Sequence, residues 1–271
     1  MAITEAEDLY GAKDVDFPLV FRLEQSNVNC FPALMNHLDR TWISRLYPDN
    51  PSRRINSLNC YDPVDGVDAA ERLEAAQQLF RRHNVPFHVR WTPLVPAELD
   101  EEMNLRRWER YSDSSVLERT IFALGEADLP DGYRIERSDL SVWMKHFEAV
   151  GGTDISRVTP EALASLKGSL VCVPLEKLCL SVLDAAGKPC AVLLGVLDGD
   201  CLGIFDVATD PAERRKGFAH SLVVEAQRMG AEAGAIRAWL QVDGKNEAAK
   251  RLYGVLGYRE TYRYHYCRPQ V

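Results

Sequence analysis

The sequence predicts a mixed α/β (α+β) protein in which a mostly antiparallel central sheet is flanked by helices. The prediction rests first on residues 202–233, where a strand-like apolar run leads through a basic turn into a run with helical spacing of apolar residues. It rests second on tight turns at residues 184–188 and 198–200, which separate short apolar runs as in consecutive antiparallel hairpins. A weak internal repeat is the third observation, and it predicts two related halves.

The turn at residues 210–219 has the features of an anion site. A turn that leads from a strand into a helix presents unpaired backbone N–H groups, and the helix dipole there also favours negative charge. Gly217 permits close approach of a ligand to the backbone, and Ala219 keeps a nearby position small. Arg214, Arg215 and Lys216 add charge that suits a pyrophosphate. Taken alone, the turn is also consistent with an ordinary solvated basic face.

Two motifs that follow one another along the chain favour the ligand site. The first consists of Arg214, Gly217 and Ala219, and the second of Asn246, Ala249, Tyr253, Gly257 and Tyr258. Both resemble motifs of the GNAT N-acetyltransferase superfamily, and the first is similar to its acetyl-coenzyme A loop. The resemblance covers roughly residues 130–271. It implies the GNAT fold, acetyl-coenzyme A as co-substrate, an amine acceptor, and chemistry that requires no metal.

The same resemblance implies roles for individual residues. The residues implied to bind the coenzyme are Val207, Ala208, Thr209, Arg214, Arg215, Lys216, Gly217, Phe218, Ala219, His220 and Asn246. Tyr253 is expected beside the coenzyme sulfur, as the acid that protonates the leaving thiolate. The base stays open, because Gln241 stands where some relatives have a glutamate and cannot accept a proton. Asp206 and a water chain are the other options, and a catalytically weak acyl-coenzyme A sensor is the alternative function.

The N-terminal half resembles a degenerate copy of the C-terminal half. Its expected elements are a helical run at 17–38 interrupted at Pro32, strands at 42–46, 54–58 and 87–91, helices at 68–83 and 97–107, and a strand-like run after Trp108. Pro63 and Trp108 are separated by 45 residues, as are Pro211 and Leu256. Two aspartates at residues 64–68 replace the basic turn and would repel a pyrophosphate. We therefore expect a tandem protein with a degenerate domain at 1–124 and an acetyltransferase domain at 125–271. An unrelated α/β domain that recruits a partner remains an alternative for the first half.

The second half has further expected elements around its hairpins. These are a strand at 133–136, helices at 140–150 and 160–166, a loop at 151–158, and strands at 178–183, 190–197, 240–242 and 262–266. Tyr262, Tyr264 and Tyr266 share one face of the last strand. That face either lines an acceptor pocket or packs on a helix as part of an edge strand. His146 is interpreted as a packing residue.

Composition limits the class of protein. A net charge of −8 argues against a nucleic-acid partner and is compatible with a cationic amine substrate, either a small molecule or a peptide. The apolar runs are too short for a membrane span, and the acidic N-terminal residues are unlike a signal peptide. The seven cysteines form no CxxC pair, which favours reduced thiols and a cytoplasmic location, with Cys267 the one expected outside the core. Whether the chain forms a homodimer is left open.

Overall fold

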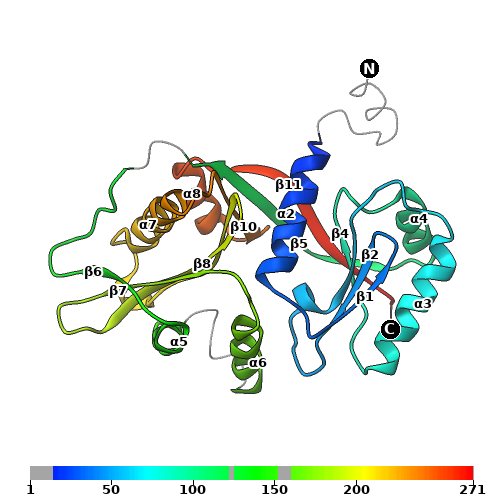
Figure 1. Ribbon diagram of the computed structural model, residues 1–271, viewed down its shortest axis with the longest axis horizontal. Coiled ribbons are helices and arrows are strands. Elements are labelled where there is room, and N and C mark those ends of the chain that lie inside the picture. Colours follow the sequence, from blue (N-terminus) through cyan, green and yellow to red (C-terminus); the bar gives the residue numbers. More distant parts are fainter. Residues whose placement is uncertain (1–14, 122–124, 152–159, 271) are drawn as a thin grey trace. The chain divides into compact units, whose positions relative to one another are not determined.

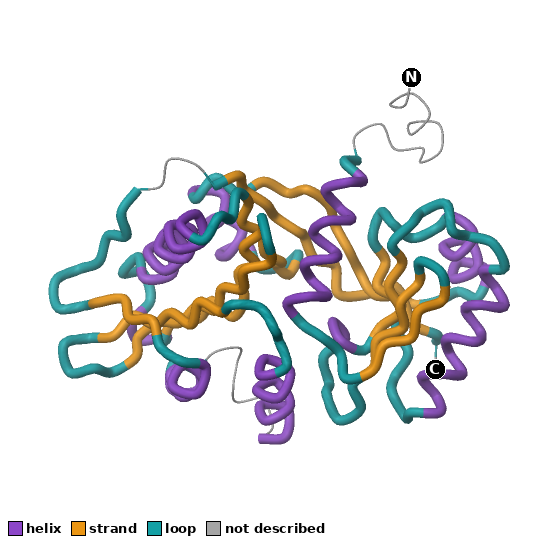
Figure 2. Tube along the Cα trace, in the orientation of Figure 1, coloured by secondary structure: helices purple, strands orange, loops and turns teal. Residues whose placement is uncertain are grey.

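The chain folds into two compact units in a computed structural model that describes residues 15–121, 125–151 and 160–270 (Figures 1 and 2). Unit 1 comprises Met1–Val116, Val242–Lys245 and Glu260–Val271, and unit 2 comprises Leu117–Gln241 and Asn246–Arg259. The C-terminal strand of the chain therefore belongs to unit 1, although it follows unit 2 in sequence. The predicted domain limits, 1–124 and 125–271, stay a prediction.

Unit 1 is built on a sheet with the strand order β1-β2-β3-β4-β11-β5. Its strands are β1 (Met35–Asp39), β2 (Trp42–Leu46), β3 (Ser57–Cys60), β4 (Val89–Trp91), β11 (Arg259–Arg268) and β5 (Glu109–Thr120), and its helices are α2 (Phe17–Cys30), α3 (Ala69–Arg82) and α4 (Ala97–Leu105). The β3–β4 pair is parallel, whereas β1–β2, β2–β3 and β4–β11 are antiparallel. The predicted mixed, mostly antiparallel sheet is thus confirmed for this unit.

The two faces of this sheet differ in chemistry. Leu58 and Val89, which are register partners, contribute to an apolar cluster with Leu73 of α3. Their neighbours on the opposite face are polar, and there Arg90 forms a buried ion pair with Glu24 of α2 at 2.7 Å. Burial of two charges is tolerated because the pair is also hydrogen-bonded. The layer under α2 therefore depends on polar contacts, whereas the layer under α3 depends on apolar packing.

Unit 2 is built on the strands β6-β7-β8-β9-β10, with the C-terminal end of β5 beside β10. Its strands are β6 (Arg134–Arg137), β7 (Lys177–Leu183), β8 (Pro189–Asp198), β9 (Cys201–Thr209) and β10 (Arg237–Asp243), and its helices are α5 (Leu140–Ala149), α6 (Pro160–Val171), α7 (Phe218–Glu232) and α8 (Glu247–Val255). Three antiparallel pairs, β6–β7, β7–β8 and β8–β9, are followed by the parallel pair β9–β10. Figure 1 shows α7 on one face of these strands and α5 on the other. The predicted hairpins before the basic turn are confirmed.

The internal repeat is visible as a repeat of element order. In each half a strand leads through a turn into a long helix, then into a parallel neighbouring strand and a short helix. Both long helices are entered through a left-handed residue, Asp68 (φ 57°) before α3 and Gly217 (φ 83°) before α7. The two turns therefore share a left-handed residue before the helix but differ in side chains.

Several sequence expectations for the bounds and types of individual elements were wrong in detail. Residues 32–38 do not continue a helix, because α2 ends at Cys30 and β1 begins at Met35. The strand expected at 54–58 is instead a short 3₁₀ turn, Arg53–Ile55, followed by β3. The helix expected at 160–166 continues to Val171, and most of the loop expected at 151–158 lies outside the described residues.

The C-terminal strand also differs from the expectation of an exposed edge. Because β11 lies between β4 and β5, both of its edges are paired, and Cys267 is buried, contrary to our expectation. The exposed cysteine among the described residues is Cys172. Tyr262 donates a hydrogen bond of 2.6 Å to Glu24, so the tyrosine face packs on α2 within unit 1. It therefore follows the helix-packing alternative, but in an interior strand.

Candidate functional site

The parallel pair β9–β10 separates before β9 ends. Its register runs from Cys201 paired with Arg237 to Ile204 paired with Leu240, and β9 continues to Thr209. On its other side β9 stays paired with β8 as far as Thr209. Among the described residues, the register therefore gives Val207, Ala208 and Thr209 no strand partner on the β10 side. Backbone groups on such an open edge can pair with an extended ligand, as an added strand would.

A β-bulge shapes this open edge. The β8–β9 register shifts between Val192 and Leu194, whose partners are Ala208 and Phe205, so β9 carries one extra residue there. Within the shifted interval Asp206 adopts a left-handed conformation, with φ 49°. A bulge bends its strand and re-aims side chains, and it is enriched near active sites. Asp206 is half-buried at this point, and Gln241 follows directly after the last paired residue of β10.

The turn after β9 leads into helix α7, whose N-terminus has no side-chain cap. Asp210 orders the start of the turn by accepting a hydrogen bond of 2.9 Å from the backbone N–H of Ala212. Arg215 then takes a positive φ of 68°, and Gly217, at φ 83°, is the N-cap residue of α7. No side chain caps α7, so the backbone N–H groups of its first turn have no side-chain acceptor. This geometry is suited to bind an anion.

The three basic residues of the turn do not have the same surroundings. Arg214 and Arg215 are exposed and form no ion pair with any residue that the structure describes. Lys216 instead donates to Glu213 at 2.6 Å and to the hydroxyl of Tyr133 at 2.9 Å. These hydrogen bonds raise the pKa of Lys216 far above its ordinary value. The two arginines are therefore freer to meet a ligand than the lysine.

The first turn of α7 is fixed by contacts on its inner side. Phe218 is buried, and its ring lies 4.7 Å from the ring of Tyr133, centroid to centroid. Ser221 donates a hydrogen bond to the backbone carbonyl of Asp128. Ala219 and His220 are half-buried. The side chain of Phe218 thus anchors the helix, which leaves its backbone N–H as the group that could meet a coenzyme.

The second motif shapes helix α8. The side chain of Asn246 caps α8 by accepting from the N–H of Ala249 at 3.1 Å. Gly257, at φ 82°, ends the helix, and the N–H of Tyr258 bonds back to the carbonyl of Tyr253, a Schellman arrangement. Asn246 and Gly257 therefore have evident backbone roles. The hydroxyl of Tyr258 accepts from the side chain of Gln227, whereas no backbone role falls to the hydroxyl of Tyr253.

Tyr253 lies in a buried and apolar position. Its side chain is 7% exposed, and its ring makes an edge contact with Tyr258 at 5.7 Å. Burial raises the pKa of Tyr253 to about 12. The phenol is therefore neutral across the physiological range and can act only as a proton or hydrogen-bond donor to an anion.

A hollow of about 590 Å³ lies beside the first half of α7, within unit 2. It is lined by Glu118, Arg119, Thr120, Gly125, Glu126, His220, Val224, Val255, Leu256, Gly257 and Arg259. Glu118 is already paired with Arg237 at 2.6 Å, and Arg119 donates to the carbonyl of Leu256. Arg259 is exposed and has no ion-pair partner in the described part of the chain. Sequence reasoning missed Arg119, which lies far from both motifs, and Arg259, which directly follows Tyr258 but belongs to neither motif.

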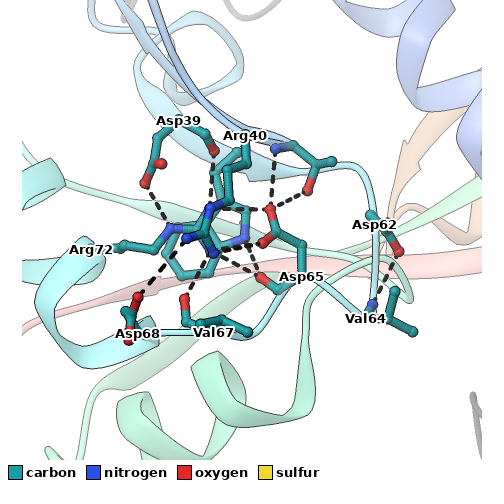
Figure 3. A network of polar contacts seen from close by, with 10 residues as sticks. Asp39, Arg40, Asp62, Val64, Asp65, Val67, Asp68 and Arg72 are labelled. Carbon is teal, nitrogen blue, oxygen red and sulfur yellow. Dashed lines mark hydrogen bonds and ion pairs between the residues drawn. The ribbon is translucent and has the colours of Figure 1, made fainter.

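The corresponding turn in unit 1 is already filled by its own side chains (Figure 3). Asp65 binds Arg72 at 3.0 Å and also accepts from the hydroxyl and N–H of Thr41, so its carboxylate faces the start of α3. Burial alone would raise the pKa of Asp65, but the hydrogen bonds from Arg72 and Thr41 lower it to about 2. A Cβ added at Gly66 would lie 1.9 Å from a carboxylate oxygen of Glu98. The carboxylates of Asp65 and Glu98 lie at this turn and would repel a pyrophosphate.

Comparison with known proteins identifies the class to which this site belongs. Residues 167–258, which contain β9, the basic turn, α7 and α8, match the family described as "Acetyltransferase (GNAT) family". The match confirms the predicted resemblance to the GNAT N-acetyltransferase superfamily for residues 167–258. This match supports an acyltransferase at the level of the family.

Individual relatives are more distant. The chain is 23% identical over 250 residues to "Uncharacterized N-acetyltransferase YobR" of Bacillus subtilis, covering 90% of this chain and 96% of the relative. A solved structure titled "GCN5-related N-acetyltransferase from Kribbella flavida" is 18% identical, with a TM-score of 0.68 over 96% of this chain and 98% of that chain. A "Tandem GNAT protein from the clavulanic acid biosynthesis pathway" is 10% identical, with a TM-score of 0.66 over 90% and 86% of the two chains. These structures support a GNAT fold in a tandem arrangement.

Three further observations bear on the sequence expectations. The described residues contain no cluster of histidine, cysteine, aspartate or glutamate that could hold a metal ion. None of the described helices has the length and apolar character that a membrane span requires. His146 shares a hydrogen bond of 2.9 Å with Ser181, and burial lowers its pKa.

Proposed function

We propose that the chain transfers an acetyl group from acetyl-coenzyme A to the primary amine of a small molecule or peptide, by direct attack in a ternary complex. The observation that carries this proposal is the open edge of β9 next in sequence to an uncapped helix N-terminus. The amides of a pantetheine arm would pair with the backbone at Val207, Ala208 and Thr209. The pyrophosphate would then meet the first N–H groups of α7, with Arg214 and Arg215 beside it.

The hollow beside α7 is the proposed binding site for the adenosine end of the coenzyme. His220 belongs both to the first turn of α7 and to the lining of this hollow, so a ligand held at the helix N-terminus can extend into it. A 3′-phosphate in the hollow would be attracted to Arg259, which has no ion-pair partner among the described residues. The volume of about 590 Å³ is within the usual range for ligand sites.

The proposed reaction forms one bond and breaks one. The lone pair of the neutral amine attacks the thioester carbonyl carbon, the C–S bond breaks, the acetamide forms, and coenzyme A leaves as a thiolate. The amine nitrogen must lose one proton, and the thiolate must gain hydrogen bonds or a proton. Backbone N–H groups on the open edge of β9 are candidates to stabilise the charge that develops on the carbonyl oxygen.

Tyr253 is proposed to stabilise the leaving thiolate. An ordinary thiol has a pKa of about 8.5, whereas the pKa of Tyr253 is raised to about 12. Complete proton transfer from this phenol to a free thiolate would therefore be uphill by about 4–5 kcal/mol. We infer that Tyr253 donates a strong hydrogen bond to the sulfur, and that solvent completes the protonation.

The proton from the amine has two proposed destinations. Asp206 stands at the bulge and offers a carboxylate, and a water chain is the other option. Gln241 follows the last paired residue of β10 but cannot accept a proton. If Asp206 is the base, Asp206→Asn should abolish the acidic limb of the pH–rate profile; if the substrate amine itself titrates, that limb should persist.

Gln241 also favours a second candidate function. A protein that holds the coenzyme without a strong base could act as an acyl-coenzyme A sensor, since binding requires only the β9 edge and the α7 N-terminus. The two candidates share a site and differ in turnover.

One set of measurements separates them. Calorimetry with coenzyme A should give one binding event per chain, because the turn in unit 1 is filled by Asp65 and Glu98. Mass spectrometry of mixtures with acetyl-coenzyme A and a panel of amines should then detect an acetamide. Binding without any acetamide would favour the sensor, and absence of coenzyme binding would refute both candidates.

A further inference from the structure

Unit 1 contains a second hollow that the acetyl-transfer site does not use. It has a volume of about 440 Å³ and is lined by Phe21, Gln25, Val28, Asn29, Leu38, Thr41, Ile43, Tyr61 and Asp62. All of these residues belong to unit 1. The volume is that of a site for a small organic ligand.

The walls of the hollow come from three separate elements. The residues from α2 recur at helical spacing on a flank that does not pack on the sheet. Leu38 and Ile43 are register partners in the β1–β2 hairpin, so their side chains share one face. Tyr61 is held in place because its hydroxyl donates to the backbone carbonyl of Glu24 at 3.2 Å. The hollow is therefore a preformed feature of the fold.

The lining is mainly apolar and aromatic. Phe21 is 42% exposed and Leu38 is 66% exposed, so two large apolar side chains face solvent at this hollow. The rings of Phe21 and Tyr61 meet edge to face, with centroids 5.8 Å apart. Exposed apolar surface around a concavity marks a binding site for a ligand with an apolar body.

Two electrostatic features favour a positive charge on that ligand. Asp62 is the single charged residue of the lining, and no lysine, arginine or histidine of the described chain pairs with it. The last turn of α2, which also lines the hollow, carries no basic residue to balance the negative end of the helix dipole. The aromatic faces would add cation–π attraction. An anion would meet only repulsion here.

We propose that unit 1 binds a small organic ammonium ion with an apolar body, in the hollow between α2 and the β1–β2 hairpin. The ammonium lies toward Asp62, and the apolar body lies against Phe21, Tyr61 and Leu38. The site holds its ligand without acetylating it, because the anion turn of unit 1 is filled by Asp65 and Glu98.

The test uses a ligand that cannot be an acetyl acceptor. Phenethyltrimethylammonium has no N–H, so its binding reports charge and shape independently of the transferase reaction. Calorimetry on the full chain should show saturable binding at submillimolar to millimolar concentration. The neutral 2-phenylethanol should bind at least tenfold more weakly. Absence of saturable binding of the ammonium, or equal binding of the alcohol, would overturn the proposal.

Two matched substitutions locate the site. Asp62→Asn removes the charge but keeps the oxygen that accepts from the N–H of Val64, so the turn is retained. It should weaken binding of the ammonium about tenfold or more. Asp68→Asn removes the same charge from the same turn, outside the lining, and asparagine tolerates the left-handed conformation there. It should leave binding within about twofold, and equal effects of the two substitutions would overturn the assignment to Asp62.

A second copy of the chain is the competing occupant. Light scattering on the wild type and on Leu38→Arg distinguishes it from a small ligand. A dimer that Leu38→Arg dissociates, combined with absence of ammonium binding, would assign the hollow to self-association and refute the proposal. A monomer that binds the ammonium supports it. Neither result depends on whether acetyl transfer is observed, so the two proposals can fail separately.

Discussion

The phenol of Tyr253 has no backbone role in the fold, unlike the side chain of Asn246 in the same motif. Asn246 caps α8, whereas Tyr253 presents a neutral hydroxyl from a buried position, with a pKa of about 12. At the scale of single residues, Asn246 therefore stabilises helix α8, whereas Tyr253 is available for the reaction. It also predicts that two neighbouring tyrosines respond differently to loss of their hydroxyls.

Tyr253→Phe should lower kcat while leaving coenzyme binding and stability nearly unchanged. A hydrogen bond to a charged group contributes about 1.5–3 kcal/mol, so kcat should fall about 10- to 100-fold. The matched control is Tyr258→Phe, which removes a hydroxyl that Gln227 contacts at 2.8 Å. It should destabilise the protein by about 1–2 kcal/mol with little effect on kcat. Steady-state kinetics and urea unfolding measure both effects, and full activity of Tyr253→Phe would remove the residue from the mechanism.

The basic turn gives a second test at the scale of residues. Arg214→Ala and Arg215→Ala should each weaken coenzyme A binding by about 1–2 kcal/mol, because neither guanidinium has another ion partner among the described residues. Lys216→Ala should have a smaller effect, since that ammonium already binds Glu213 and Tyr133. Calorimetry on the three single variants gives the order. If Lys216→Ala were the most damaging, the turn would have to rearrange on binding.

At the scale of elements, α3 and α7 both begin after a left-handed residue, but the side chains beside the two helix starts have opposite charge. The N-terminus of α7 follows exposed arginines, whereas the N-terminus of α3 lies near the carboxylate of Asp65. In unit 1, Arg72 turns back from α3 to neutralise that carboxylate. The turn in unit 1 thus carries its own anion, while the turn in unit 2 has the features needed to bind one.

The hollow beside α7 predicts selective recognition of the coenzyme's 3′-phosphate. Arg259→Ala should weaken binding of coenzyme A about 5- to 20-fold, corresponding to about 1–2 kcal/mol for a charge-assisted contact. Dephospho-coenzyme A, which lacks the 3′-phosphate, should bind wild type and variant equally. Arg263→Ala is a control at an exposed arginine that is already paired with Glu260 at 2.7 Å. An equal loss for both ligands would place the adenosine end elsewhere.

The Asp65–Arg72 pair predicts a pH dependence of stability. The pKa of Asp65 is about 2 in the folded chain and about 3.9 when unfolded, so its stabilisation is complete above pH 4 and is lost as the pH falls toward 2. Asp65→Asn should lower the free energy of unfolding by about 2 kcal/mol at pH 5. The gap between wild type and variant should close between pH 4 and pH 2, as measured by urea unfolding. Glu74→Gln, at an exposed site, should show no comparable gap, and a constant gap for Asp65→Asn would contradict a role for its charge.

The sequence was sufficient for elements whose signals are local. The basic turn, α7 and the capped helix α8 could be predicted because glycine, asparagine and apolar spacing specify them directly. The β1–β2 hairpin could not, because its turn uses Arg40 in a left-handed conformation (φ 53°), without glycine or asparagine. Burial of Cys267 could not be predicted either, since it depends on which strands flank β11. Arg119 and Arg259 escaped notice for the same reason.

At the scale of the molecule, unit 1 is discontinuous in sequence, and strand β5 runs from unit 1 into unit 2. Unit 1 includes β11 from the C-terminus, and unit 2 includes the end of β5, which follows the helices of unit 1 in sequence. The contact of Tyr262 with Glu24 joins residues 238 positions apart. The residues before 117 therefore do not contain the whole of unit 1.

Removal of β11 should unfold unit 1. A chain that ends at Arg259 leaves the buried Arg90–Glu24 pair without the tyrosines of β11 and exposes β4 as an edge. We expect loss of the cooperative unfolding transition of unit 1 in calorimetry and rapid proteolysis within residues 15–116. A chain that lacks only residues 269–271 is the control and should unfold like wild type. Retention of the full unfolding enthalpy by the chain ending at Arg259 would contradict the place of β11 in unit 1.

The position of β11 also bears on the order in which the protein matures during its synthesis. A ribosome that adds about 5–20 residues per second needs about 8–30 s to travel from the end of the N-terminal segment of unit 1 to β11. Throughout that interval the nascent chain lacks the strand that pairs with one edge of β4. Glu24 then has no contact with Tyr262, and Arg90 has none with Tyr264. Unit 1 can finish folding only after β11 has been made, so its N-terminal segment is completed later than unit 2 is synthesised.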